Sequence, residues 1–453
     1  MSSISSHAAG AAHAGHEHAH DHAHNPTYDM AHVDLSEANT RMPAGWGKVS
    51  GIALLVIGAV LSIATLVPAF TSNVADESGA KLAKHAISAY HTGFIVMLTM
   101  TLGPLGLVMI FHLVKAGWAV TIRRQLENMA ALVPAALIMF TPIVLATVIV
   151  KQDILFKWMS PALLATDPLL VAKSPFLNAT FFYIRLAIYF AIWLFVAMRL
   201  NRLSREQDTS GNKDLTVRAG LTSAWGILAF ALSLAFASFD LIKSLDFHWF
   251  STMFGVYIFA GSMVAAVATL VLTLAVIRGQ GRLKGLVTSE HLHDLGKLLL
   301  AFTIFWAYVN FSQYFLIWYA NIPEETAWYM LRTNNGWQYL GIALILLHFV
   351  VPFLLLLWRG SKRSIGILAV AAVLLLAMHC VDIFYCIRPI VYMGFESGGI
   401  IKGKVGYSWM DLTGILGPVL VFVGLLIRKI GSGPLIPMQD PRLPEALGHK
   451  NYI

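Results

Sequence analysis

Long apolar blocks alternate with short polar segments along almost the whole chain. Ten of these blocks have the roughly 20 consecutive, mostly apolar residues that a helix needs to cross the hydrocarbon core of a bilayer. The pattern predicts an all-α integral membrane protein with about ten transmembrane helices. The predicted spans are 47–70, 88–114, 126–150, 177–201, 219–242, 251–277, 294–320, 336–359, 364–386 and 408–430.

The polar ends of the chain set the domain boundaries. Residues 1–46 are predicted to form a His-rich, disordered tail, 47–430 a single polytopic membrane domain, and 431–453 a C-terminal tail. The chain opens without the charged segment, short apolar core and small-residue site of a secretory signal, so we expect no cleavable signal peptide.

Two connections between the spans are long. Residues 151–176 are rich in Leu and Pro but have no apolar stretch long enough to span, which predicts an interfacial helix, and residues 387–407 are rich in Gly. Each loop is either a docking site for a peripheral partner or a plain connection.

Composition supports a lipid environment. Only 12% of the residues are charged and 57% are hydrophobic, whereas about a quarter of a globular protein is charged. The formal charge of +8 would suit a nucleic-acid partner. The Lys and Arg residues are instead spread over the short loops, as in membrane proteins, so we expect no nucleic-acid binding.

The basic residues also predict an orientation. The tails, the even-numbered loops and the adjoining helix ends hold 20 of the 32 Lys and Arg, the opposite side holds 10, and Arg185 and Lys297 lie inside spans. Because positive charge favours the cytoplasmic side, both termini are predicted to be cytoplasmic.

Cysteine and histidine usage bears on cofactors. Cys380 and Cys386 are the only cysteines. They cannot form the C-x-x-C-H motif of a c-type haem or the thiolate set of an iron–sulfur cluster, and small core residues are the simpler interpretation. The histidines within spans give no depth-matched pairs for haem b. We therefore expect this chain to bind no redox cofactor of its own.

The N-terminal tail contains a cluster of histidines. Clustered imidazoles bind zinc, copper or nickel, so a metal site is one interpretation, and a tail without fixed geometry is the other. The histidines of the possible metal site are His16, His18, His20, His22 and His24.

Ionisable side chains inside spans are costly and usually face a bundle interior or a transport path. They fall into two layers, with His348 alone near the middle. The outer layer comprises His91, Asp240, Lys243, Asp246, His248, His379, Asp382 and Arg388, with Arg185 somewhat deeper, and the inner layer comprises His112, Glu127, Asp294 and Lys297.

Two groups in the outer layer have helical spacing. His379 and Asp382 are three residues apart and share one helix face. Asp240, Lys243 and Asp246 repeat that spacing with alternating sign. Each group is either a proton relay beside a quinol site or a set of neutralised pairs that fixes helix packing. The first interpretation is favoured for His379 and Asp382.

Three segments resemble the polysulfide-reductase (NrfD-like) family of membrane subunits, in particular the F subunit of alternative complex III, a quinol:cytochrome c oxidoreductase. The resemblance covers roughly residues 47–430. The segments are FDLIKSLDFHWFSTMFGVYIFAG at 239–261, HLHDLGKLLLAFTIFWAYVNFSQYFLIWYANIPEET at 291–326 and KSPFLNATFFYIRLAIYFAIW at 173–193.

The resemblance implies two four-helix bundles, here spans 2–5 and 6–9, flanked by spans 1 and 10. It also implies a respiratory complex in the bacterial cytoplasmic membrane. The expected partners are a paralogous NrfD-like membrane subunit, an iron–sulfur subunit and haem c subunits on the outer face.

One departure from the family bears on quinol binding. Arg124 and Glu127 match an Arg-x-x-Glu motif that begins a helix in quinol-binding relatives. The outer half of this helix reads FTPIVLATVIV at 140–150, without the His and Arg that follow in those relatives. The departure argues against a complete quinol site, although quinone or quinol binding stays an alternative.

The leading hypothesis is therefore a subunit that supports quinol oxidation and conducts protons. Glu127 would take up protons near bulk water on the inner side, and His379 and Asp382 would act in the outer half. An independent secondary transporter that uses the buried charges is the alternative, and a purely structural anchor is a third. Transporters often have helices broken by Gly or Pro in corresponding halves, but Gly103-Pro104 in span two has no clear counterpart in span six.

Overall fold

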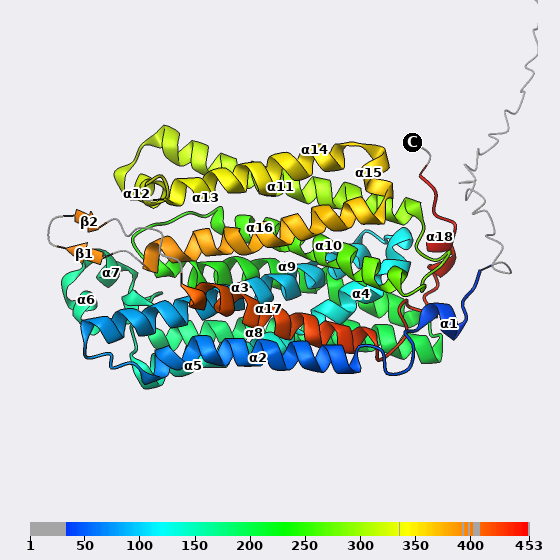
Figure 1. Ribbon diagram of the computed structural model, residues 1–453, viewed down its shortest axis with the longest axis horizontal. Coiled ribbons are helices and arrows are strands. Elements are labelled where there is room, and N and C mark those ends of the chain that lie inside the picture. Colours follow the sequence, from blue (N-terminus) through cyan, green and yellow to red (C-terminus); the bar gives the residue numbers. More distant parts are fainter. Residues whose placement is uncertain (1–32, 335, 392–393, 397–398, 402–407, 452–453) are drawn as a thin grey trace, which may run out of the picture.

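The computed structural model describes residues 33–334, 336–391, 394–396, 399–401 and 408–451. Within these residues, ten helices are long and apolar enough to cross a membrane, and they lie side by side along the long axis of the molecule (Figure 1). The chain is an all-α integral membrane protein, as its hydrophobic pattern predicts.

Each predicted span corresponds to one long helix or to a run of helical segments. The predicted ends are right to within about three residues for the first, sixth, eighth and tenth spans. Other helices extend further than predicted, most clearly α3, which begins at Glu77 rather than 88, and α8, which ends at Ser210 rather than 201, because their terminal turns are polar and the apolar pattern does not include them. The spans in chain order are α2 (Lys48–Thr71), α3 (Glu77–Leu113), α4 (Val120–Ala130) with α5 (Val133–Leu145) and η3 (Ala146–Val150), α8 (Ala179–Ser210), α9 (Asp214–Leu241), α10 (Phe254–Gly279), α11 (Ser289–Ala320), α13 (Trp337–Ala343) with η6 (Leu344–Val350) and α14 (Val351–Leu357), α16 (Ile365–Val391) and α17 (Trp409–Ile430).

Two spans are irregular. The third span breaks between α4 and α5, where Pro134 has no N–H to continue the helical hydrogen bonds. Both η3 and η6 are wide, π-helical turns, a form of helix that is frequent at functional sites. His348 lies in η6.

Packing between the spans forms two four-helix bundles. The first bundle comprises α3, α4 with α5, α8 and α9, and the second comprises α10, α11, the run from α13 to α14, and α16. Helices α2 and α17 pack extensively on each other and on α3. The expected arrangement, spans 2–5 and 6–9 with two flanking helices, is confirmed.

The two bundles meet where α3 and α10 cross. Nearly all side chains of the apolar parts of both helices are buried. At Gly103 the backbones approach so closely that a Cβ atom would collide with the carbonyl oxygen of Ser262. Small residues at such a crossing let the helices pack tightly in lipid, where no hydrophobic effect drives them together.

The outward faces of the peripheral helices are apolar. Ile63 on α2, Ile184 on α8, Leu228 on α9 and Phe311 on α11 are all at least half exposed. An exposed surface of this kind is stable only in a lipid environment.

The connections contain short helices and one hairpin. The strands β1 and β2 pair antiparallel. The connecting elements are α1 (Glu37–Thr40), η2 (Gly117–Ala119), η4 (Lys157–Met159), α6 (Pro161–Thr166), α7 (Pro168–Lys173), η5 (Lys243–Leu245), α12 (Pro323–Arg332), α15 (Arg359–Arg363), β1 (Gly394–Glu396), β2 (Gly399–Ile401) and α18 (Leu443–Leu447).

The loop at 151–176 differs from its prediction. It contains two short helices, α6 and α7, rather than one interfacial helix, because Pro161 and Pro168 each start a new helix. The side chain of Asp167 lies between them and accepts hydrogen bonds from the N–H groups of Leu169 and Leu170 at 2.9 and 3.1 Å, which caps α7.

The expected boundary of the disordered tail at residue 46 is wrong for residues 33–46. Asn39 and Thr40 are buried. The Asn39 carbonyl accepts the N–H of Leu283, and the Thr40 carbonyl accepts the N–H of Leu435. These bonds attach the segment to the end of the bundle, a tertiary effect that the polar sequence does not reveal. Residues 1–32 lie outside the described residues.

Candidate functional site

The second bundle encloses a carboxylate. Asp382 on α16 is 1% exposed. It accepts hydrogen bonds from the Tyr257 hydroxyl on α10 and from the indole Nε1 of Trp306 on α11, the latter at 3.0 Å. Three helices thus converge on one acid, and we call Asp382, Tyr257 and Trp306 the Asp382 site.

Two buried histidines lie near this site. His379 forms a 2.8 Å hydrogen bond through Nε2 with Thr99 Oγ1 of α3, across the boundary between the bundles. His348 packs against the ring of Trp306 with a centroid distance of 4.0 Å. The sequence predicts that His348 lies alone between the two layers of ionisable groups, and its ring contact in the structure is with an aromatic residue, Trp306. In the described part of the chain, neither His348 nitrogen nor His379 Nδ1 has a hydrogen-bond partner.

His379 and Asp382 share α16 but contact different neighbours. His379 faces α3, whereas Asp382 faces α10 and α11. Among the described residues no hydrogen bond joins the two side chains directly. Trp306 contacts both Asp382 and His348, so it joins His348, rather than His379, to the Asp382 site.

In the first bundle Asp240 is paired with Arg185. Arg185 donates through Nε and Nη2 to the two carboxylate oxygens at 2.9 and 2.7 Å, and the Tyr189 hydroxyl donates to Asp240 at 3.0 Å. Both charged residues are buried. The predicted alternating run is thus split, because Asp240 forms its ion pair with another helix rather than with Lys243.

The remaining outer residues have local partners. His91 Nε2 lies 2.7 Å from the carbonyl oxygen of Leu241. Lys243 lies over the ring of Phe239, and Asp246 accepts a long hydrogen bond from a backbone N–H. Among the described residues, none of these three side chains forms a hydrogen bond or a ring contact with the Asp382 site.

His248 binds the capping carboxylate of α7. Its Nε2 lies 2.7 Å from Asp167 Oδ2. Burial alone would raise the pKa of Asp167, but the N–H of Leu170 and the imidazole of His248 outweigh that effect and hold this pKa below its usual value. The contact fixes the outer loop on the end of α9.

A second outer cluster joins α16 to α17 and α3. The guanidinium of Arg388 lies 2.6 Å from Asp411 and also contacts Ser88 and His85. Arg388 is fully buried. The cluster stabilises the first turn of α17 and involves none of the residues of the Asp382 site.

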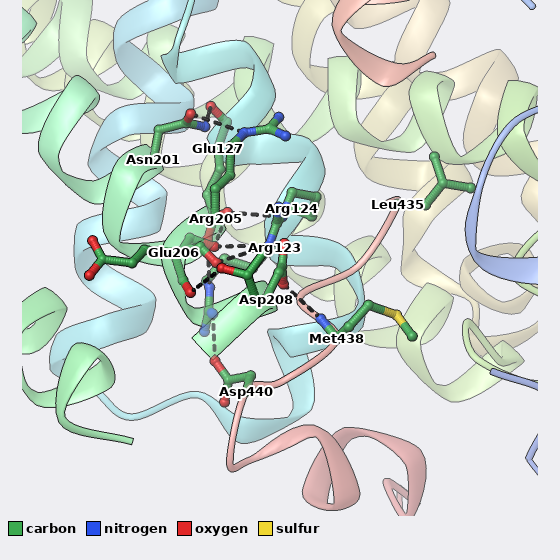
Figure 2. Close-up of polar contacts among 12 residues, drawn as sticks. Arg123, Arg124, Glu127, Asn201, Arg205, Glu206, Asp208, Leu435, Met438 and Asp440 are labelled. Atoms are coloured by element: carbon green, nitrogen blue, oxygen red, sulfur yellow. Dashed lines mark hydrogen bonds and ion pairs between the residues drawn. The ribbon is translucent and has the colours of Figure 1, made fainter. Parts of the chain in front are cut away.

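At the opposite end of the molecule Glu127 lies in an ion network on α4. Arg123 Nε and Arg124 Nε lie 3.0 and 3.2 Å from the two Glu127 oxygens. Ser204 Oγ donates to Glu127 at 2.6 Å. Arg124 also pairs with Asp208 of α8 at 2.8 Å. Figure 2 shows these side chains pointing toward one another between the two helices.

The C-terminal segment covers this network. Asp440 pairs with Arg123 at 2.6 Å, and the N–H of Met438 donates to Asp208 at 3.0 Å (Figure 2). Glu127 is 2% exposed. The sequence predicts that Glu127 lies nearer bulk water than Asp382, and in the structure the C-terminal segment covers it. Its charge is compensated by two guanidinium groups, and this geometry favours an anchoring role over proton uptake.

The other inner residues lie at the same end. His112, at the end of α3, is within electrostatic range of Arg123 and Glu127. Lys297 donates to Asp294 at 2.9 Å and to Asn451 at 3.0 Å. This second pair also attaches the C-terminal segment.

The described part of the chain contains no candidate metal site, and its two cysteines are free. Among the described residues, no group of three or more His, Cys, Asp or Glu side chains is arranged to hold a metal ion. The histidine cluster at 16–24 lies outside the described residues. Cys380 and Cys386 are free thiols, and Cys386 is buried.

Several contributors could not be identified from the sequence. Tyr257 and Trp306 lie in apolar spans without any special spacing relative to Asp382. Asp440 lies in a segment that reads as a polar tail. Only the three-dimensional packing brings them to their charged partners.

No protein-family model matches this chain, and no curated protein matches its sequence.

Proposed function

We propose that this chain is a membrane subunit of a respiratory quinol:cytochrome c or quinol:oxidase oxidoreductase complex. In this proposal it supports quinol oxidation and conducts protons without a redox cofactor of its own. It resides in the bacterial cytoplasmic membrane with both termini in the cytoplasm. Its partners are a paralogous membrane subunit, an iron–sulfur subunit and haem c subunits on the outer face.

The proposal rests on where the three family-like segments meet. Tyr257 comes from the segment 239–261 and Trp306 from 291–326, and both donate to Asp382. Arg185 from 173–193 pairs with Asp240 from 239–261. The residues that carry the resemblance thus surround the buried carboxylates, as expected if the segments have a shared function.

The chemistry of the Asp382 site suits proton transfer. A buried carboxyl that faces a hydroxyl can take up or release one proton without large movement. His348 and His379 add imidazole groups nearby, and ionisable groups at this depth in a membrane usually mark an ion or proton path. In this proposal the chain holds no redox cofactor, so the electrons of the quinol would pass to the partner subunits.

Asp382→Asn tests the proposal in the assembled complex. The variant keeps the shape of the side chain and removes its ability to carry a proton. We expect normal assembly, unchanged quinol affinity, and a loss of turnover or proton translocation. The matched control is Asp214→Asn, which changes an exposed acid at the start of α9. Its turnover and its rate of proton translocation should equal those of the wild type.

Two results would contradict the proposal. If Asp382→Asn lowers assembly or thermal stability while turnover per assembled complex is unchanged, the site serves packing only. If the tagged wild-type chain purifies from its native membrane without iron–sulfur and haem c subunits, the chain is not a subunit of the proposed respiratory complex. The second outcome would favour the transporter alternative, although α3 and α10 are continuous helices without the paired breaks typical of that class.

A further inference from the structure

An apolar groove runs along the membrane-facing side of the molecule between α3, α10, α16 and α17. Its volume is about 320 Å³, within the range of ligand pockets. Its walls are almost wholly apolar, and Cys380 and His379 line it as well. Residues that line its length include Met100, Val276, Ala377, Val423, Ile430 and Trp46.

A polar pocket lies at the end of the bundle that holds α1 and the C-terminal segment. Its volume is about 420 Å³, and it is lined by Arg41, Arg282 and the backbone of 431–433. The Nε atom of Arg282 is buried and has no hydrogen-bond partner among the described residues. Two guanidinium groups, those of Arg41 and Arg282, beside a Gly-Ser-Gly turn suit a phosphate group.

The groove and the pocket are lined by neighbouring residues on three segments of the chain. Trp46 lines the groove, and residues 42–44 line the pocket. Ile430 lines the groove, and residues 431–433 line the pocket. On α10 and its following turn, Val276 lines the groove and Arg282 lines the pocket. The basic pocket thus lies beside one end of the apolar groove.

We propose that this composite site binds one anionic glycerophospholipid. The phosphate lies between Arg41 and Arg282, and one acyl chain lies in the groove. Basic pockets between transmembrane helices bind anionic head groups, and a Trp at the mouth is typical of the membrane–water interface. The proposal does not depend on the proposed respiratory function.

The carboxylate of Glu37 lies where it would repel an anionic ligand, which provides a further test of the proposal. Glu37 also lines the pocket, and its carboxylate lies 3.3 Å from Arg41. Both side chains are at least half exposed, and exposed pairs of this kind contribute little to stability. The phosphate competes with Glu37 for the same guanidinium, so Glu37→Gln should tighten lipid binding.

The experiment uses the full chain in nanodiscs that contain phosphatidylcholine and phosphatidylglycerol. After transfer to detergent, native mass spectrometry counts the lipids that stay bound. We expect one phosphatidylglycerol to be retained in preference to phosphatidylcholine. Removing a basic residue near the membrane surface should lower this preference about fivefold, so Arg41→Gln with Arg282→Gln should lower it about 25-fold.

Two further variants complete the test. Val423→Trp fills the groove and should release the lipid, whereas Arg218→Gln, which changes an exposed basic residue near the start of α9, should not change retention. Equal retention of both lipids by the wild type overturns the proposal. So does an unchanged preference in the double arginine variant, or retention that responds to the arginines and not to Val423→Trp, which would mean head-group adsorption without a built site.

Discussion

Asp382 accepts a 3.0 Å hydrogen bond from Trp306, although the two residues lie on separate helices and far apart in sequence. This bond ties α11 to α16 through a donor that cannot itself give up a proton at physiological pH. Trp306 can therefore orient the carboxylate through Oδ2, while Oδ1 accepts the Tyr257 hydroxyl and is the oxygen that a proton path would use.

Trp306→Phe removes this donor and keeps an aromatic ring against His348. The loss of one hydrogen bond to a buried carboxylate should reduce the free energy of unfolding by about 1–3 kcal/mol. The midpoint of thermal unfolding in nanodiscs measures the effect. Trp318→Phe, on the exposed face of the same helix, is the control, and equal midpoints for the two variants would show that the bond is unimportant.

The buried pair of Arg185 and Asp240 should be sensitive to geometry as well as to charge. Asp240→Asn leaves a buried guanidinium without its counter-ion, and breaking such a pair costs about 3–5 kcal/mol. Arg185→Lys keeps the charge but cannot form the two parallel bonds at 2.9 and 2.7 Å, so it should also destabilise the protein.

Thermal unfolding of both variants checks this prediction. Arg218→Lys, which changes an exposed residue of α9, should leave the midpoint unchanged. If Arg185→Lys is as stable as this control, the bidentate geometry has no energetic importance.

The sequence predicts the spans well because their signal is local. A run of apolar residues that is long enough to cross a bilayer identifies each helix, whatever its neighbours are. The two-bundle arrangement is predicted not from this pattern but from the resemblance of the sequence to a known family. Errors occur where local rules compete, as at Pro134, which divides the third span, or at Pro161 and Pro168, which divide an outer loop into two helices.

The composition of the sites could be predicted only in part. Asp382, Asp240 and Glu127 are conspicuous because charge in an apolar span is costly. Their partners are ordinary residues on other helices, and neither composition nor spacing distinguishes Tyr257 or Trp306 from other core aromatics. The pairing of Asp240 with Arg185, rather than with Lys243, depends on the orientation of α8 against α9.

The predicted topology can be tested with two cysteine variants. The first and last helices, α1 and α18, lie at the same end of the molecule (Figure 1). Lys450→Cys at that end should react with an impermeant maleimide only after spheroplasts are opened, whereas Glu324→Cys on α12 should react in intact spheroplasts. The wild type, whose two thiols lie in α16, is the control, and the reverse labelling pattern would invert the topology.

The C-terminal segment should act as a structural clamp on the inner ion network. Asp440 is 4% exposed and lies 2.6 Å from Arg123. Asp440→Asn removes its charge but leaves Arg123 with Glu127, so the cost should be about 1–3 kcal/mol, less than that of a fully broken buried pair. We expect a lower unfolding midpoint and faster proteolysis within 431–453, because this part of the segment then loses its ion pair and keeps only hydrogen bonds, such as those of the Met438 N–H to Asp208 and of Gln125 Nε2 to the Leu435 carbonyl. Asp214→Asn is the matched control at the same end of the bundle. Should the Asp440 variant resist proteolysis as well as this control, the segment is held by its apolar contacts at Leu435 and Ile436, and the ion pair is not a clamp.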